Sequence, residues 1–372
     1  MSLEIKMPQL QIGDLTAKVP IVQGGMGIGV SMSNLAAAVA NEGGIGVISA
    51  SGVGLYETDF NSNFTEANRR ALRQELKKAR QMTKGVIGVN IMVAFKDCLD
   101  LIKTAVEEFV DVIFIGAGLP LNIPDSLIPN KLNNIKTKIV PIVSSGKAAN
   151  LIFRYWQSHF NRVPDAVVVE GPLAGGHLGF KTEQIDDPKY CLENLVSDVI
   201  AEVKPYESFA NTAIPVIAAG GIYTGADIHR FISSGAQGVQ MATRFVATHE
   251  CDASKDFKET YIKCKMGDLK IIKSPAGLPG RAIKNKFLED VELGKKVPSK
   301  CRWRCLTTCT FQNSPYCICD ALVNAQKGNF NDGYAFAGAN AYRIDSIMSV
   351  KELMATLVEE YEQAAANNKA AL

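Results

Sequence analysis

The chain has 372 residues, of which 47% are hydrophobic and 21% are charged, and its formal net charge is +2. This composition is ordinary for a globular protein and gives no electrostatic basis for binding nucleic acid or an acidic membrane surface. No apolar run approaches the roughly 20 residues that a membrane span needs, and residues 1–15 lack the apolar segment of a signal peptide.

Short apolar runs predict eight buried strands. In chain order they are residues 21–26, 45–49, 86–92, 112–118, 139–145, 166–171, 215–221 and 238–245. Segments with apolar residues at helical spacing lie between several of them, at 33–43, 65–82, 97–109, 147–157 and 224–235. Strands that alternate with helices predict a parallel sheet covered on both faces.

The number of strand–helix units predicts the architecture. Eight units are the count for a (β/α)8 TIM barrel, and residues 20–265 match its usual length of roughly 250 residues. An open doubly wound sheet is the alternative. The glycines at 24, 25, 27 and 29 do not fit its G-x-G-x-x-G dinucleotide fingerprint. We therefore expect an α/β fold with a barrel over residues 1–265.

The alternation stops after about residue 266. Residues 274–283, SPAGLPGRAI, predict a loop, and residues 350–368 predict the last of two helices. We expect residues 266–372 to form a smaller helical cap that packs on the barrel. Its five cysteines, at 301, 305, 309, 317 and 319, match neither zinc nor ferredoxin spacing. All nine cysteines are expected to be reduced thiols in a cytoplasmic protein.

Glycines and amides gather where the predicted strands end, and that is the edge of a barrel where active sites lie. The ends of the seventh and eighth strands, Gly220-Gly221 and 240–243, fall where barrels commonly hold a phosphate. Each glycine taken singly is equally well explained as the end of a strand. Two such loops on neighbouring strands favour a phosphorylated ligand.

His177 is the candidate catalytic residue among four histidines. It follows the small residues 174–176 just beyond the sixth strand, and its imidazole can exchange a proton near neutral pH. His159, His229 and His249 lie on predicted helices or at their entries, where a structural role is expected. The strand ends carry no metal motif and no G-x-S-x-G nucleophile, so a cofactor is expected to supply the chemistry.

Six motifs together resemble the nitronate monooxygenases, formerly called 2-nitropropane dioxygenases, a superfamily that includes flavin-dependent enoyl-acyl-carrier-protein reductases. They are QGGMG (23–27), VNIM (89–92), EGPLAGGHLGF (170–180), PVIAAGGI (215–222), GVQMATRFVAT (238–248) and SPAGLPGRAI (274–283). The resemblance implies an FMN-dependent barrel. FMN would take electrons from an alkyl nitronate, and O2 would then reoxidise the flavin.

The resemblance also implies roles for individual residues. Gly24, Gly25 and Met26 would lie against the isoalloxazine ring, Asn90 and Glu170 would hydrogen-bond the flavin, and Gly175 and Gly176 would leave it room. Gly220, Gly221, Gln240, Met241, Ala242 and Thr243 would hold the phosphate. His177 would bind the nitronate or deprotonate a nitroalkane. No residue is expected to bind a metal.

Three positions depart from the pattern. Leu173 stands where many relatives have glutamate, and Ala242 replaces a frequent glycine. Ser145, which we include in the expected cofactor site, stands where some nitronate enzymes have lysine.

Two other functions remain open from the sequence. One is an NAD(P)H-dependent enoyl-thioester reductase on the same flavin barrel, and the other is a phosphate-ligand binding barrel without redox activity. A small-molecule substrate and O2 are the expected partners. A homodimer is left open, and neither nucleic acid nor a membrane is expected as a partner.

Overall fold

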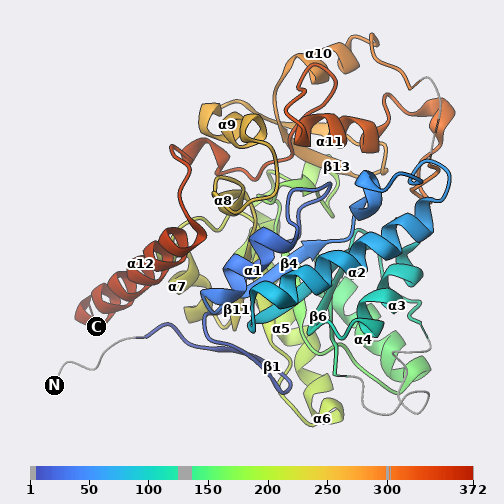
Figure 1. Ribbon diagram of the computed structural model, residues 1–372. Coiled ribbons are helices and arrows are strands. Elements are labelled where there is room, and N and C mark those ends of the chain that lie inside the picture. The colour runs from blue at the N-terminus through green and yellow to red at the C-terminus, as the bar shows by residue number, and fades with distance from the viewer. Residues whose placement is uncertain (1–5, 125–135, 299–300, 302, 372) are drawn as a thin grey trace.

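Eight parallel strands form a closed barrel in the computed structural model, which describes residues 6–124, 136–298, 301 and 303–371 (Figure 1). The barrel strands are β3 (Ile21–Gln23), β4 (Ile45–Ser49), β5 (Val86–Met92), β6 (Val112–Gly116), β7 (Lys138–Val143), β8 (Val167–Glu170), β10 (Val216–Ala219) and β11 (Gly238–Met241). They are hydrogen-bonded in that order, and β10 pairs with both β8 and β11. Each predicted apolar run contains or overlaps one of them, so the (β/α)8 barrel is confirmed.

The barrel interior is filled by branched and aromatic side chains. Val22, Val47, Phe114 and Val168 belong to one buried cluster there, as expected for strands covered on both faces. The same cluster includes Leu10 from a short antiparallel hairpin, β1 (Leu10–Ile12) and β2 (Leu15–Ala17). This hairpin, which the sequence did not predict, covers the end of the barrel opposite the site.

The barrel strands are surrounded by helices. These are α1 (Ser33–Asn41), α2 (Phe64–Met82), α3 (Cys98–Glu107), α4 (Gly146–Phe160), α5 (Leu192–Val203), α6 (Glu207–Ala210) and α7 (Gly225–Ser233). Short 3-10 turns occur at Val53–Tyr56, Thr182–Gln184, Pro188–Tyr190, Lys204–Tyr206, Phe311–Asn313 and Ala341–Arg343. None of the helices in the described ranges combines the length and the apolar character that crossing a bilayer requires.

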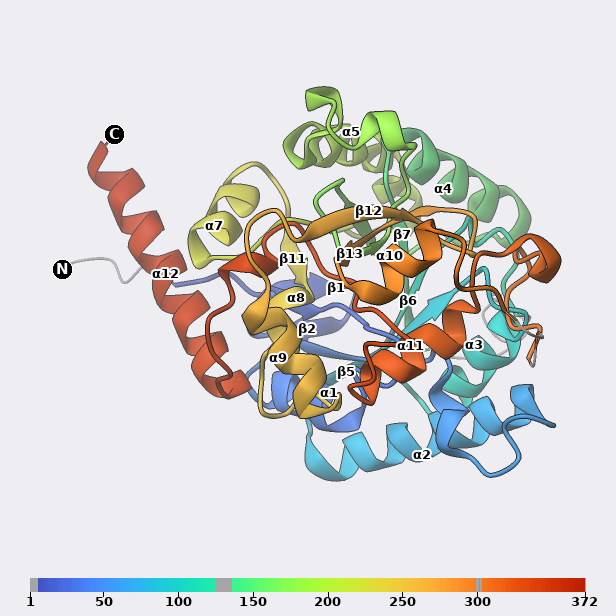
Figure 2. The same cartoon turned by 90° about the horizontal axis from the view of Figure 1, so that it is seen from above.

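The last helix, α12 (Val350–Ala371), lies beside α7 on the outside of the barrel (Figures 1 and 2). The backbone N–H of Gly225, the first residue of α7, donates to Glu360 Oε2 at 2.6 Å. Leu353 and Leu357 of α12 are buried in the cluster that joins barrel and helices. The chain therefore returns to the barrel after building the cap.

The segment between α7 and α12 covers one end of the barrel (Figure 2). It contains α8 (Thr243–Val246), α9 (Lys255–Lys263), α10 (Lys286–Glu292), α11 (Ile318–Gln326), β12 (Leu269–Lys273) and β13 (Pro279–Ile283). β13 lies within residues 274–283, where we expected a loop, and β12 lies just before them in a section that we expected to be helical. The two strands pair as an antiparallel hairpin, and β13 also pairs with β9 (Gly176–His177), a contact that is not visible in either segment alone. The proposed boundary at residue 265 stays a prediction.

Candidate active site

A cavity of about 270 Å3 lies between the carboxyl ends of the barrel strands and the covering segment. Its lining includes every residue predicted for the site except one. These are Gly24, Gly25, Met26, Asn90, Glu170, Gly175, Gly176, His177, Gly220, Gly221, Gln240, Met241, Ala242 and Thr243. The structure thus brings together residues from five barrel strands, although their roles toward a cofactor stay predictions.

Ser145 is the exception, and its predicted role toward a cofactor stays a prediction. It does not belong to the cavity lining. Its hydroxyl accepts a hydrogen bond from the backbone N–H of Ala148 at 3.2 Å and caps the N-terminus of α4. Serine is a preferred residue at this position because it satisfies a helix N–H group that has no partner within the helix.

The loop after β3 and the end of β5 form one side of the cavity. A side chain at Gly25 would place its Cβ 2.3 Å from the Cβ of Asn90, so only glycine lets the loop pass so close to β5. The amide nitrogen of Asn90 donates to the backbone oxygen of Phe114 at 3.4 Å. Its amide oxygen has no donor among the described residues and remains free to accept a hydrogen bond from a ligand.

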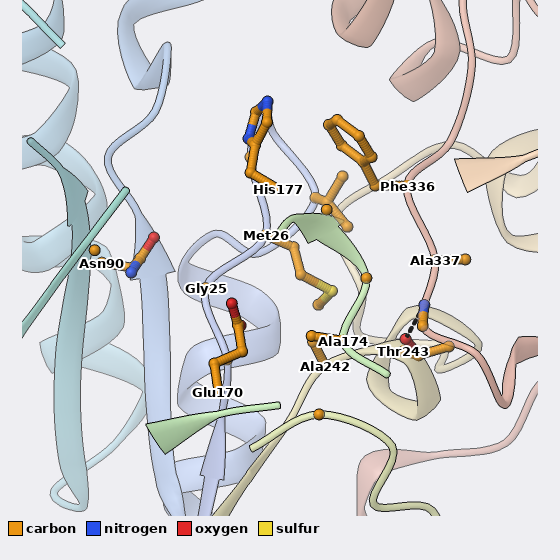
Figure 3. Close-up of a pocket in the computed structure, with 18 of the residues that line it drawn as sticks. Gly25, Met26, Asn90, Glu170, Ala174, His177, Ala242, Thr243, Phe336 and Ala337 are labelled. Carbon is orange, nitrogen blue, oxygen red and sulfur yellow. Dashed lines mark hydrogen bonds between the residues drawn. The ribbon is translucent and has the colours of Figure 1, made fainter. Parts of the chain in front are cut away.

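Glu170 ends β8 and points its carboxyl group toward the cavity (Figure 3). No side chain or backbone group in the described part of the chain hydrogen-bonds to it. Burial without a partner disfavours the charged form and raises the pKa of Glu170 to about 7. A ligand with N–H or O–H donors would meet an acceptor here that the protein itself leaves unsatisfied.

The loops after β10 and β11 form the opposite end of the cavity. Gly221 has a φ of +85°, and among the described residues nothing accepts its backbone N–H or that of Thr243, the first residue of α8. Thr243 Oγ1 instead accepts from the N–H of Gly338 at 3.0 Å, which ties this end to the cap (Figure 3). Free N–H groups at a loop and a short helix after the last two strands are typical of phosphate sites in barrels.

Leu173, which departs from the family pattern, lies at this same end. A Cβ on Gly221 would be 2.9 Å from the Cβ of Leu173, and the backbone oxygen of Leu173 accepts from Ala339 N at 3.0 Å. Leu173 therefore lies next to the candidate phosphate site.

His177 is held by β9, whose two residues pair with Arg281 and Gly280 of β13. Its Nε2 is 2.7 Å from Ser274 Oγ, and its ring meets the edge of Phe336 at a centroid distance of 5.0 Å. Burial lowers the pKa of His177 to about 4, because a charged imidazole would lose its hydration there. The ring is therefore neutral at pH 7 and can accept or donate one proton at Nδ1, which has no partner among the described residues.

Two residues that hold this geometry were missed by the sequence analysis. The guanidinium of Arg281, buried on β13, donates through Nη1 to the backbone oxygens of Pro172 and Ala174, at 2.5 and 2.9 Å. Ser274 hydrogen-bonds His177 across 97 positions of sequence. An arginine within the apolar end of SPAGLPGRAI was the available signal for the first, whereas nothing local marks Ser274.

Large apolar side chains form another part of the cavity wall, and most of them come from the cap. They are Ile28, Met92, Phe95, Leu306, Ile318, Leu322, Tyr334 and Phe336. Tyr334 is fully buried, and its hydroxyl accepts a hydrogen bond from that of Tyr316 at 3.0 Å. A substrate beside His177 would therefore meet hydrocarbon on most sides.

Comparisons with known proteins show the family and support the fold. A family model described as nitronate monooxygenase matches residues 9–114 and 102–360. A "probable nitronate monooxygenase" of Staphylococcus aureus is 28% identical over 302 residues, covering 74% of this chain and 78% of the relative. A Mycobacterium tuberculosis protein named (3aS,4S,5R,7aS)-5-hydroxy-7a-methyl-1-oxo-octahydro-1H-indene-4-carboxyl-CoA dehydrogenase is 25% identical, covering 91% and 92%. The solved structure of FabK from Thermotoga maritima superimposes with a TM-score of 0.72 at 28% identity, covering 95% and 96%.

Proposed function

Because the chain belongs to the nitronate monooxygenase family, we propose that this oxidoreductase depends on FMN and oxidises alkyl nitronates with O2. One observation carries the proposal. The same cavity holds a neutral histidine at one side and, at its other end, free backbone N–H groups suited to a phosphate. The unpaired carboxyl group of Glu170 adds an acceptor near the middle.

The residues present fit FMN. The N–H groups of Gly221 and Thr243 would hold the phosphate, and Asn90 and Glu170 would accept hydrogen bonds from the ribityl chain or the ring. Gly25 and Met26 would line the ring. When bound, FMN would supply the redox chemistry by accepting electrons from the substrate and passing them to O2.

His177 would act on the substrate through Nδ1. Ser274 Oγ already accepts from Ala276 N at 3.2 Å, and it can still donate a hydrogen bond to Nε2 of His177 or accept one from Nε2–H. In the first arrangement Nδ1 carries a proton and donates to an anionic nitronate. In the second, Nδ1 is a base that can remove a proton from a neutral nitroalkane.

An enoyl-thioester reductase is the second candidate. The apolar wall contributed by the cap would accommodate a hydrocarbon chain, and one relative is named for a CoA thioester. On this reading NAD(P)H reduces the flavin and the thioester receives the hydride.

Anaerobic mixing distinguishes the two candidates. We expect the 450 nm band of the flavin-loaded protein to bleach with propionate 3-nitronate or a nitroalkane, and O2 to restore it. Bleaching by NADH or NADPH alone, with no response to either nitro compound, would favour the reductase. A protein that takes up no flavin would contradict both candidates.

The phosphate end can be tested without assuming a substrate. Charge-assisted hydrogen bonds contribute about 1.5–3 kcal/mol each, so two or more should make FMN bind at least about 100-fold more tightly than riboflavin. In Ala242→Glu a carboxylate would repel the phosphate and reduce FMN affinity, while riboflavin affinity changes little. Fluorescence titration measures both ligands on both proteins. Equal affinities for FMN and riboflavin in the unmodified protein would refute the phosphate assignment.

A further inference from the structure

Two cysteines meet at the boundary between the active-site cavity and a second hollow. The Sγ atoms of Cys305 and Cys319 are 3.2 Å apart, and both residues are buried. A disulfide requires about 2.05 Å, so the sulfurs need to approach by only about 1 Å. Cys319 lies in the first turn of α11 and lines the cavity described above.

Cys305 faces the second hollow. It lines a hollow of about 480 Å3 together with Cys301, Cys309, Cys317 and Arg304. Within the described ranges, no three or more histidine, cysteine or acidic residues are arranged to hold a metal ion. We therefore treat Cys305 and Cys319 as two thiols, and a small solute can reach Cys305 through the hollow.

The two sulfurs differ in character. The hydrogen bond between the two thiols, which either sulfur can donate, lowers the pKa of Cys305, and the same contact together with burial raises the pKa of Cys319. Other thiols shift the opposite way to Cys305: burial is the largest cause that raises the pKa of Cys98, Cys251 and Cys264 to about 11. Since the thiolate is the reactive form, Cys305 is the favoured nucleophile.

We propose that Cys305 and Cys319 are a redox-active dithiol that peroxide converts to a disulfide at the cavity wall. The Cys305 thiolate attacks H2O2, forming a sulfenic acid and releasing hydroxide, which takes up a proton to become water. The Cys319 thiol then attacks the Cys305 sulfur, forming the S–S bond and releasing the second water. A reduced dithiol reverses the process by thiol–disulfide exchange.

The bond would join two segments that build the wall. The backbone around Cys305 is fixed to the loop after β5, since Lys96 N donates to Cys305 O at 2.9 Å and Thr307 N donates to Ala94 O at 2.9 Å. Leu306 comes from this segment, and Ile318 and Leu322 come from α11. Oxidation would thus cross-link the apolar side of the cavity.

Counting thiols tests the proposal independently of substrate or flavin. The full chain is reduced, desalted and treated with about one equivalent of H2O2. It is then denatured in the presence of N-ethylmaleimide, and its intact mass is measured by mass spectrometry. We expect nine modified cysteines without peroxide and two fewer after it. In Cys305→Ser and in Cys319→Ser the peroxide-dependent loss of a pair should disappear, whereas Cys309→Ser and Cys317→Ser should keep it.

Peptide mapping of the unmodified protein covers the case in which a serine variant does not fold. Cleavage after Trp303, Leu306, Phe311 and Tyr316 places Cys305, Cys309 and Cys319 in separate fragments, and backbone fragmentation in the mass spectrometer distinguishes Cys319 from Cys317 in the last one. The expected product joins the Cys305 fragment to the Cys319 fragment. Nine thiols that all remain modifiable after peroxide, or a pair loss that persists in both Cys305→Ser and Cys319→Ser, would overturn the proposal.

Discussion

The variant His177→Ala is expected to bind flavin normally and to lose between about 10²- and 10⁴-fold of its turnover. That range is typical for removing a positioned general acid or base. Flavin affinity should stay within about threefold, because the candidate phosphate contacts come from Gly221 and Thr243. Fluorescence titration and steady-state assays, with whichever substrate bleaches the flavin, measure the two effects separately.

His159→Ala is the matched control, since His159 is exposed on α4 and stacks on Tyr155 away from the cavity. Its turnover should be unchanged. The neutral state of His177 can be followed by NMR of the four labelled histidines. The signal that disappears in His177→Ala should titrate near pH 4, because burial favours the neutral ring. Titration near pH 6.5, or unchanged turnover in His177→Ala, would reject the assigned role.

Gly225→Val is expected to destabilise the protein by about 3 kcal/mol, a typical cost of overpacking. A Cβ on Gly225 would be 2.2 Å from the backbone oxygen of Leu357 and 2.3 Å from the nitrogen of Tyr361. Backbone atoms cannot move aside as a side-chain tip can, so α12 would have to separate from α7. Urea unfolding followed by circular dichroism measures the loss.

Ala226→Val introduces the same side chain at the next position of α7, which is exposed. It should change the free energy of unfolding by no more than about 0.5 kcal/mol. Equal stability of Gly225→Val and the unmodified protein would show that the contact between α7 and α12 does not contribute to folding.

The barrel was predictable because its signal is local. The runs at 86–92 and 166–171 are mostly apolar, as expected for strands covered on both faces, and their polar residues Asn90 and Glu170 stand near the strand ends. The strands β9 and β13 were not predictable. β9 has two residues and is a strand only through its pairing with β13, and β13 begins with Pro279 and Gly280, which usually indicate a loop.

Some residues of the site were likewise predictable from the local sequence, and others were not. Gly25, Glu170 and Thr243 could be placed because strand ends of a barrel converge on one edge. Ser274 and Arg281 could not, since they act through contacts made about 100 positions away in the sequence. Ser145 lies just beyond the end of β7 but turns its hydroxyl to the N-terminus of α4, and only the structure shows that contact.

The position of α12 beside α7 has a consequence for synthesis of the chain. More than 100 residues separate Ser233, the end of α7, from Val350, the start of α12. At roughly 5–20 residues per second, a ribosome needs about ten seconds to cross that interval. During that time the apolar side of α7 that α12 will cover stays open to water, so the nascent barrel would be a natural client for a chaperone until its last helix emerges.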